Sequence, residues 1–279
     1  MNHRTAGQPE APDRRCAGWS DWAATHWSNY GGMGMRDSST GRTGLKAFLA
    51  ATPIVGPIAR LLAHSPPVEA IRRQLQFRGS STYWEERYRR GGNSGAGSYG
   101  RLAEFKAEVL NDFVAREAIG SIVELGCGDG AQLELAQYPA YVGIDVAASS
   151  IALCRTRFAE DQTKLFYHAA ALPPDIGRFD LALSLDVIYH LVEDAVFDAY
   201  MRQLFALSGR YVAIYASNQA QTTDSPHVRH RQFTGWVAAQ QPGWQLHGFI
   251  QNRYPYDPAR PEDTSFADFH IYRRDDTPA

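Results

Sequence analysis

The sequence predicts an α/β fold, with a doubly wound, mostly parallel sheet, a terminal antiparallel β-hairpin and an N-terminal helical extension. After Gly120, short β-branched runs alternate with helical patterns, which is typical of βαβ crossovers and of a parallel sheet covered on both faces. The last two strand-like runs, residues 244–251 and 266–273, are joined by the Pro-rich residues 254–261 without an intervening helix. They predict the hairpin at the sheet edge.

The alternating part, residues 101–279, is expected to form the main domain. It opens with a helix at residues 101–118, whose apolar side chains recur along one face. Strands are then predicted at residues 121–125, 141–144, 164–168, 179–185 and 210–215, and helices between them at 131–137, 148–158 and 193–207.

Two further segments precede this domain. Residues 1–40 are polar with few aliphatics and predict a disordered leader. Residues 41–100 predict the helical extension, in which prolines separate two short amphipathic helices at 58–62 and 68–75. Arginines beside their apolar faces leave open a membrane-surface or partner-binding role as well as packing on the core.

The extension ends in a Gly-rich segment that we interpret as a lid. Five of residues 91–100 are glycine, so the segment is expected to be mobile unless a ligand orders it. Ahead of it, Tyr83, Trp84, Arg87 and Tyr88 either contact a ligand or anchor the extension to the sheet.

Composition excludes several classes of protein. Lys and Arg total 28 against 30 for Asp and Glu, a net charge of −2, whereas a nucleic-acid binder usually carries a basic excess. No nucleic-acid partner is therefore expected. Three cysteines in unpatterned positions, no apolar run of about 18 residues and no signal-peptide core predict a cytoplasmic protein without a transmembrane segment.

A glycine turn between the first strand and the next helix is the main chemical signal. Gly126, Gly128 and Gly130 let the backbone approach a ligand at the positive end of a helix. Glu124 can meet an ammonium group, where a pyrophosphate would be repelled, and the Gly-x-Gly-x-Gly spacing is one residue short of the dinucleotide fingerprint. Asp145 ends the second strand, where a carboxylate can accept bonds from ribose hydroxyls.

These residues carry a resemblance to a known family. Residues 123–130, 141–146 and 179–190 resemble motifs I, II and IV of class I S-adenosylmethionine-dependent methyltransferases, in the right order and spacing. The resemblance implies a seven-stranded sheet with the last strand antiparallel, and methyl transfer by in-line displacement at the sulfonium. It also implies a cofactor site for S-adenosylmethionine, formed by Glu124, Gly126, Cys127, Gly128, Asp129, Gly130, Asp145, Val146, Asp186 and Val187.

One position departs from the family pattern. The acidic or amide residue that often follows the third strand and holds the adenine amine is replaced here by Ala169–Ala171. Backbone groups or a loop are expected to take over that task, which leaves the adenine site unassigned.

Candidate catalytic residues follow the fourth strand, because ligands of open α/β sheets sit outside the carboxyl ends of the strands. Tyr189 and His190 are the best-placed acid/base groups, although His190 equally suits a histidine that only packs the cofactor pocket.

A second group of polar residues is predicted to bind the substrate. His227, Arg229 and His230 can bind an anionic acceptor or form a solvated basic helix start, and Tyr99 reaches the site from the lid. No carboxylate motif accompanies His227 and His230, so no metal site is predicted.

The sequence thus predicts O-methylation of a small molecule or glycan. The alternative is a cofactor-binding regulatory or scaffold protein without catalysis. No oligomeric state is predicted.

Overall fold

A computed structural model describes residues 79–223 and 225–275 of the chain. The predicted leader, residues 1–40, and the two amphipathic helices predicted at 58–62 and 68–75 lie outside the described residues.

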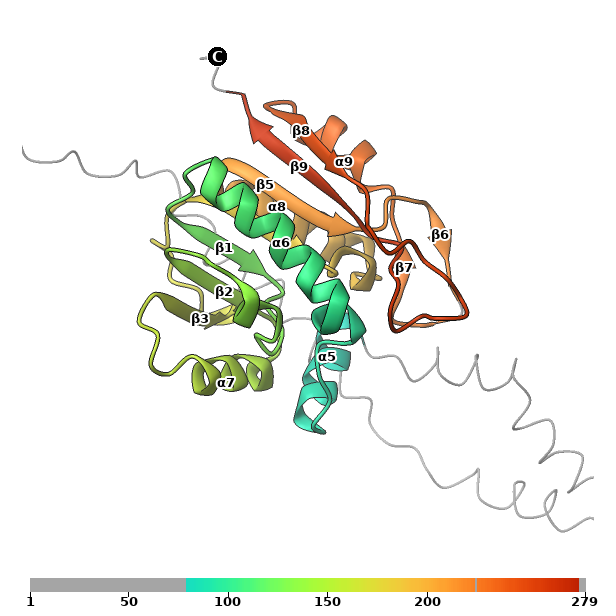
Figure 1. The fold of residues 1–279 in the computed structure, drawn as a ribbon, viewed down its shortest axis with the longest axis horizontal. Coiled ribbons are helices and arrows are strands. Elements are labelled where there is room, and N and C mark those ends of the chain that lie inside the picture. The colour runs from blue at the N-terminus through green and yellow to red at the C-terminus, as the bar shows by residue number, and fades with distance from the viewer. Residues whose placement is uncertain (1–78, 224, 276–279) are drawn as a thin grey trace, which may run out of the picture.

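The described chain is built on a seven-stranded sheet with the strand order β3-β2-β1-β4-β5-β9-β8 (Figure 1). The strands are β1 (Ile122–Leu125), β2 (Tyr141–Asp145), β3 (Lys164–His168), β4 (Phe179–Leu185), β5 (Ser208–Ala216), β8 (Trp244–Ile250) and β9 (Asp268–Arg274). The first five pair in parallel, and β9 runs antiparallel to both β5 and β8. The predicted doubly wound sheet with an edge hairpin is confirmed.

Helices cover both faces of the sheet. Figure 1 shows α6 (Gly100–Arg116) across the face nearest the viewer and α8 (Asp194–Ala206) behind the sheet. Helix α7 (Ala148–Arg157) joins β2 to β3, and α9 (Phe233–Gln240) precedes the hairpin. A further helix, α5 (Ser80–Arg89), lies beside the lower end of α6 in this view.

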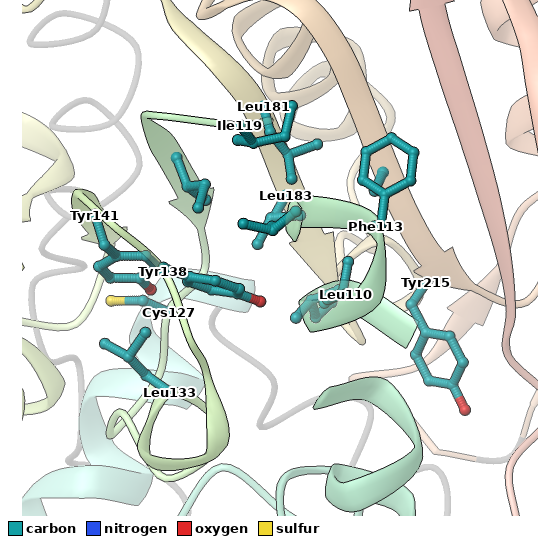
Figure 2. Close-up of a cluster of buried hydrophobic side chains, with 14 of the residues drawn as sticks. Leu110, Phe113, Ile119, Cys127, Leu133, Tyr138, Tyr141, Leu181, Leu183 and Tyr215 are labelled. Carbon is teal, nitrogen blue, oxygen red and sulfur yellow. The ribbon is translucent and has the colours of Figure 1, made fainter. Parts of the chain in front are cut away.

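Two hydrophobic clusters hold these layers together, one on each face. Beneath α6, Leu110 and Phe113 pack against Leu181 and Leu183 of the central strand β4 (Figure 2). Each such buried side chain contributes about 1.5–3 kcal/mol of transfer free energy. The second cluster lies under α8, where Tyr200 and Leu204 belong to it. Burial on both faces explains why the parallel strands read as continuous apolar runs.

Two local predictions were wrong, and one helix was missed. The helix predicted at residues 131–137 is only the short 3-10 helix η2 (Gln132–Leu135), because the chain passes through Pro139 and must return to the sheet at Tyr141. The basic helix start considered at residues 227–231 is instead strand β7 (Arg229–His230), paired with β6 (Gln221–Thr222). Helix α9 was not predicted, since its short apolar sequence has no polar face.

Candidate active site

A cavity opens at the carboxyl ends of β1, β2 and β4, where ligands of open α/β sheets bind. The predicted site residues on its wall are Glu124, Gly126, Cys127, Gly128, Asp145, Val146, Asp186, Val187 and His190. The others, which do not line it, are Tyr99, Asp129, Gly130, Tyr189, His227, Arg229 and His230.

The glycine turn brings two motifs into contact. Gly126 has φ of 82°, and a Cβ there would lie 2.5 Å from Cγ2 of Val187, which follows β4. Only glycine allows both the left-handed backbone and this close approach. The turn therefore forms one wall of the cavity and Val187 the adjoining wall.

Glu124 is a buried acid at the base of the cavity. Its Oε2 accepts a hydrogen bond of 2.7 Å from the Tyr141 hydroxyl, and its side chain is buried in β1. Burial raises the pKa of Glu124 to about 7. Such a carboxyl is ready to lose its proton when a cation arrives beside it.

Asp145 is held rigidly at the end of β2. Its two carboxylate oxygens accept from the backbone N–H groups of Gly128 at 2.9 Å and Ala147 at 2.8 Å. Burial raises the pKa of Asp145, while these N–H donors oppose the rise. Each oxygen keeps a further lone pair, so the carboxylate can still accept hydroxyl donors from the cavity.

Lys106 is a cavity residue that the sequence reasoning missed. This α6 lysine is 1% exposed, and its Nζ lies 2.6 Å from Oδ2 of Asp186. The Tyr189 hydroxyl donates to the other oxygen of Asp186 at 2.8 Å. A signal was available, because Lys106 falls between Leu102 and Leu110 on the apolar stripe of its helix.

His190 is a half-buried imidazole on the cavity wall. Its Nδ1 lies 3.0 Å from the carbonyl oxygen of His227, which can only accept, so Nδ1 carries the hydrogen and Nε2 the lone pair. Burial lowers the pKa of His190 to about 4. Its ring meets Trp84 edge-on at 4.9 Å. The imidazole is therefore neutral at pH 7 and held in one tautomer.

Helix α5 forms the roof of the cavity and is hydrogen-bonded to neighbouring elements at its start and near its middle. At its start, the Ser80 hydroxyl donates to the carbonyl of His190 at 2.7 Å and to Glu193 at 2.8 Å. Farther along, Glu85 accepts from the hydroxyl of Ser149 on α7. Trp84 and Tyr88, two of the aromatic residues predicted to contact a ligand or anchor the extension, line the cavity from this helix.

The Gly-rich segment predicted as a lid is attached to the glycine turn. The backbone N–H and hydroxyl of Ser94 both donate to the Asp129 carboxylate, at 3.1 and 2.8 Å. The Tyr99 hydroxyl donates to the same carboxylate at 2.8 Å. Asp129 thus binds the lid segment, and Tyr99 lies on that attachment.

The residues predicted to bind the substrate do not form one group, because each contacts different neighbours. The His227 ring stacks on Tyr83 at 4.4 Å and lies 5.7 Å from the ring of His190. Arg229 pairs with Asp194 at 2.9 Å, while buried His230 contacts the Ser217 hydroxyl at 2.6 Å. Only His227 is therefore close to the cavity, and the basic group is already neutralised in part.

Two further observations concern residues 79–223 and 225–275. Within this part of the chain, no three His, Cys, Asp or Glu side chains are grouped so that they could hold a metal ion. None of its helices is both long and apolar enough to cross a membrane.

A comparison with protein families identifies the central part of the chain. A family model described as a methyltransferase domain matches residues 122–208, which run from β1 to the start of β5. Residues 122–208 thus match a methyltransferase domain, which agrees with the predicted resemblance to the class I S-adenosylmethionine-dependent methyltransferases. It also agrees with S-adenosylmethionine as the methyl donor that this resemblance implies.

Several solved structures are similar to parts of this chain. The N-methyltransferase NodS from Bradyrhizobium japonicum WM9, in complex with S-adenosyl-L-homocysteine, is similar with a TM-score of 0.55 and 15% identity, over 70% of this chain and 98% of that chain. Magnesium protoporphyrin IX methyltransferase from Synechocystis PCC 6803, with bound S-adenosylmethionine, gives a TM-score of 0.46 at 15% identity, over 78% and 96% of the two chains. A search of curated proteins gave no significant match.

Proposed function

We propose that this methyltransferase transfers its methyl group to a hydroxyl oxygen of a small molecule or glycan, with His190 as the general base. The observation that carries the proposal is the state of His190, a neutral imidazole of fixed tautomer on the cavity wall. An amine acceptor attacks as its free base, whereas a poorly acidic hydroxyl needs a group that takes its proton.

The cavity supports a division of roles among its residues. Glu124 would meet the ammonium of the cofactor and Lys106 its carboxylate, since these two charges lie on the same side of the cavity. Asp145 would accept from the ribose hydroxyls. When bound, S-adenosylmethionine supplies an electrophilic methyl group on its sulfonium.

His190 and its neighbours would then act on the acceptor. His190 accepts the proton of the acceptor hydroxyl at Nε2, while the His227 carbonyl keeps the ring oriented through Nδ1. Asp186 and Val187 shape the wall beside it, and Tyr189 orients Asp186 through its 2.8 Å bond. The α5 roof limits the room above the cavity, which favours a small acceptor or a terminal sugar over a polymer surface.

Turnover of the His190→Ala variant tests the proposal. Formation of S-adenosylhomocysteine is followed with a panel of hydroxyl and amine acceptors, and His247→Ala is the control because His247 is exposed on β8. We expect a hydroxyl acceptor to be methylated, and His190→Ala to lower kcat by about 10²–10⁴-fold while S-adenosylhomocysteine still binds.

The pH profile gives a second readout. Because the base works when neutral, kcat at saturating S-adenosylmethionine should persist well below pH 6.5 and fall only as the pH approaches about 4, the pKa of His190. Full kcat in His190→Ala, or methylation of amines alone, contradicts the proposal. Cofactor binding without turnover on any acceptor favours the non-catalytic regulatory or scaffold alternative.

A further inference from the structure

A buried amide on the α8 side of the cavity has no hydrogen-bond partner. Gln203 is 7% exposed and lines the cavity. Within residues 79–223 and 225–275, its side-chain amide makes no hydrogen bond to another residue, and the amide nitrogen and oxygen are not fully enclosed. An amide offers two donors and an acceptor, so these atoms can bond to a molecule in the cavity. Such a group is expected where a ligand completes its hydrogen bonds.

The surroundings of Gln203 are otherwise apolar. The cavity residues that belong to or pack on the α8 cluster are Leu125, Ile144, Val146, Ala169, Val187, Leu191 and Tyr200. The Tyr200 hydroxyl is already bonded to the carbonyl of Leu125 at 2.8 Å and to Ser184 at 2.7 Å. Gln203 is thus the polar side chain with unused hydrogen-bonding capacity on this side.

The α6 side of the cavity differs in chemistry. It carries the ammonium of Lys106 and, at the base, the carboxyl of Glu124. Asp145 lies at the end of β2 and is paired in register with His168, directly before Ala169. The wall of the cavity therefore carries charged groups, the carboxylate of Asp145 and an apolar part with one amide.

The cofactor has three parts that match these groups in chemistry. Its methionine part is charged, its ribose bears two hydroxyls, and its purine has apolar faces and a polar edge. We propose that Gln203 binds the polar edge of the adenine ring. The amide oxygen accepts from the 6-amino group, and the amide N–H donates to the neighbouring ring nitrogen, a pairing for which a glutamine amide is well suited.

This assignment fills the position left open by the sequence after β3. The three residues Ala169–Ala171 offer no side chain that can form a hydrogen bond, and Gln203 reaches the same side of the cavity from α8. The inference rests on the cofactor alone and is independent of whether the acceptor is a hydroxyl.

Calorimetry with two ligands tests it without turnover. The ligands are S-adenosylhomocysteine and its analogue that lacks the 6-amino group, and the proteins are the full chain, Gln203→Leu and the control Gln162→Leu, which changes an exposed glutamine. The full chain and the control should prefer S-adenosylhomocysteine by about tenfold or more. In Gln203→Leu the two ligands should bind within about twofold of each other, because the discriminating amide is gone.

A ratio of dissociation constants within one variant does not depend on a change in its stability. If Gln203→Leu does not fold by circular dichroism, Gln203→Glu replaces it. Its carboxylate still accepts from the 6-amino group but cannot donate to the ring nitrogen, so S-adenosylhomocysteine should bind more weakly while its preference over the analogue remains. The inference is overturned if Gln203→Leu keeps the tenfold preference, if the full chain shows no preference, or if the full chain does not bind S-adenosylhomocysteine.

Discussion

Lys106 of α6 and Gln203 of α8 face the same cavity from opposite layers of the fold, and they differ in whether their polar groups are satisfied. Lys106 is paired with Asp186 at 2.6 Å. The side-chain amide of Gln203 makes no hydrogen bond to another described residue. A charge taken out of water must be paired within the protein for the fold to tolerate it, whereas a neutral amide can wait for a ligand. The charge of Lys106 is thus paired within the fold, whereas the amide of Gln203 is free to bond to a bound ligand.

The largest expected effect comes from breaking the charged side. Lys106→Met leaves Asp186 without its ion partner, and removal of one member of a buried pair costs about 3–5 kcal/mol of unfolding free energy. Urea unfolding measures the change. Arg116→Met is the matched control, because Arg116 is 57% exposed in its pair with Asp112 and should cost no more than about 1 kcal/mol.

A double variant separates lost pairing from lost packing. Lys106→Met combined with Asp186→Asn removes both charges and keeps a residue type that tolerates the φ of 60° at this position. We expect it to recover more than half of the loss. No recovery would mean that the aliphatic packing of Lys106, rather than the ion pair, stabilises this side.

The next largest expected effect is the pH dependence of the unfolding free energy that Glu124 causes. Its pKa is raised from 4.5 to about 7 in the folded chain, so the folded state holds the proton more tightly than the unfolded state. The resulting stability is fully present below pH 4.5 and is lost as the pH rises through about 7, by about 3 kcal/mol.

Glu124→Gln lacks this titration and keeps an acceptor for the Tyr141 hydroxyl. The unfolding free energy of the unsubstituted chain should therefore fall relative to the variant between pH 4.5 and 8. Binding of S-adenosylhomocysteine at pH 6.5 should also release a proton, seen as a dependence of the calorimetric heat on the buffer. A constant difference across this pH range contradicts the raised pKa.

The smallest effect is expected where the Gly-rich segment is bonded to Asp129, away from both Lys106 and Gln203. Ser94→Ala removes the hydroxyl bonds to Asp129, at about 1 kcal/mol, which corresponds to about fivefold weaker S-adenosylhomocysteine binding. Thr156→Ala, an exposed hydroxyl bonded within α7, is the control. Unchanged binding in Ser94→Ala would show that the segment does not contribute to the closed site.

The sequence predicted the side of the site that local motifs encode. The glycine turn, Glu124 and Asp145 belong to short segments in which strand, turn and helix follow directly, so their placement at the sheet edge could be inferred. The seven strands and the terminal hairpin could be inferred from the residue pattern for the same reason, whereas the order of the strands in the sheet was not predicted.

The rest depends on segments that are distant in the sequence. Lys106 meets Asp186 across 80 positions, and Ser94 meets Asp129 across 35. No local pattern encodes such pairings. A weaker signal exists, since Lys106 and Gln203 both interrupt otherwise apolar helical faces. A polar residue in such a face, opposite a ligand-binding sheet edge, is a useful candidate site residue.

The hydrogen bonds that hold α5 in place also bear on where a shortened chain can start. Gly79 adopts a φ of 100°, and its neighbour Ser80 connects the roof to His190 and Glu193. A truncation at the first residue of the family match would keep the strands and glycine turn but delete Lys106, Trp84 and the roof. A fragment that starts at Gly79 keeps these contacts, and we expect shorter fragments that still fold to bind the cofactor poorly.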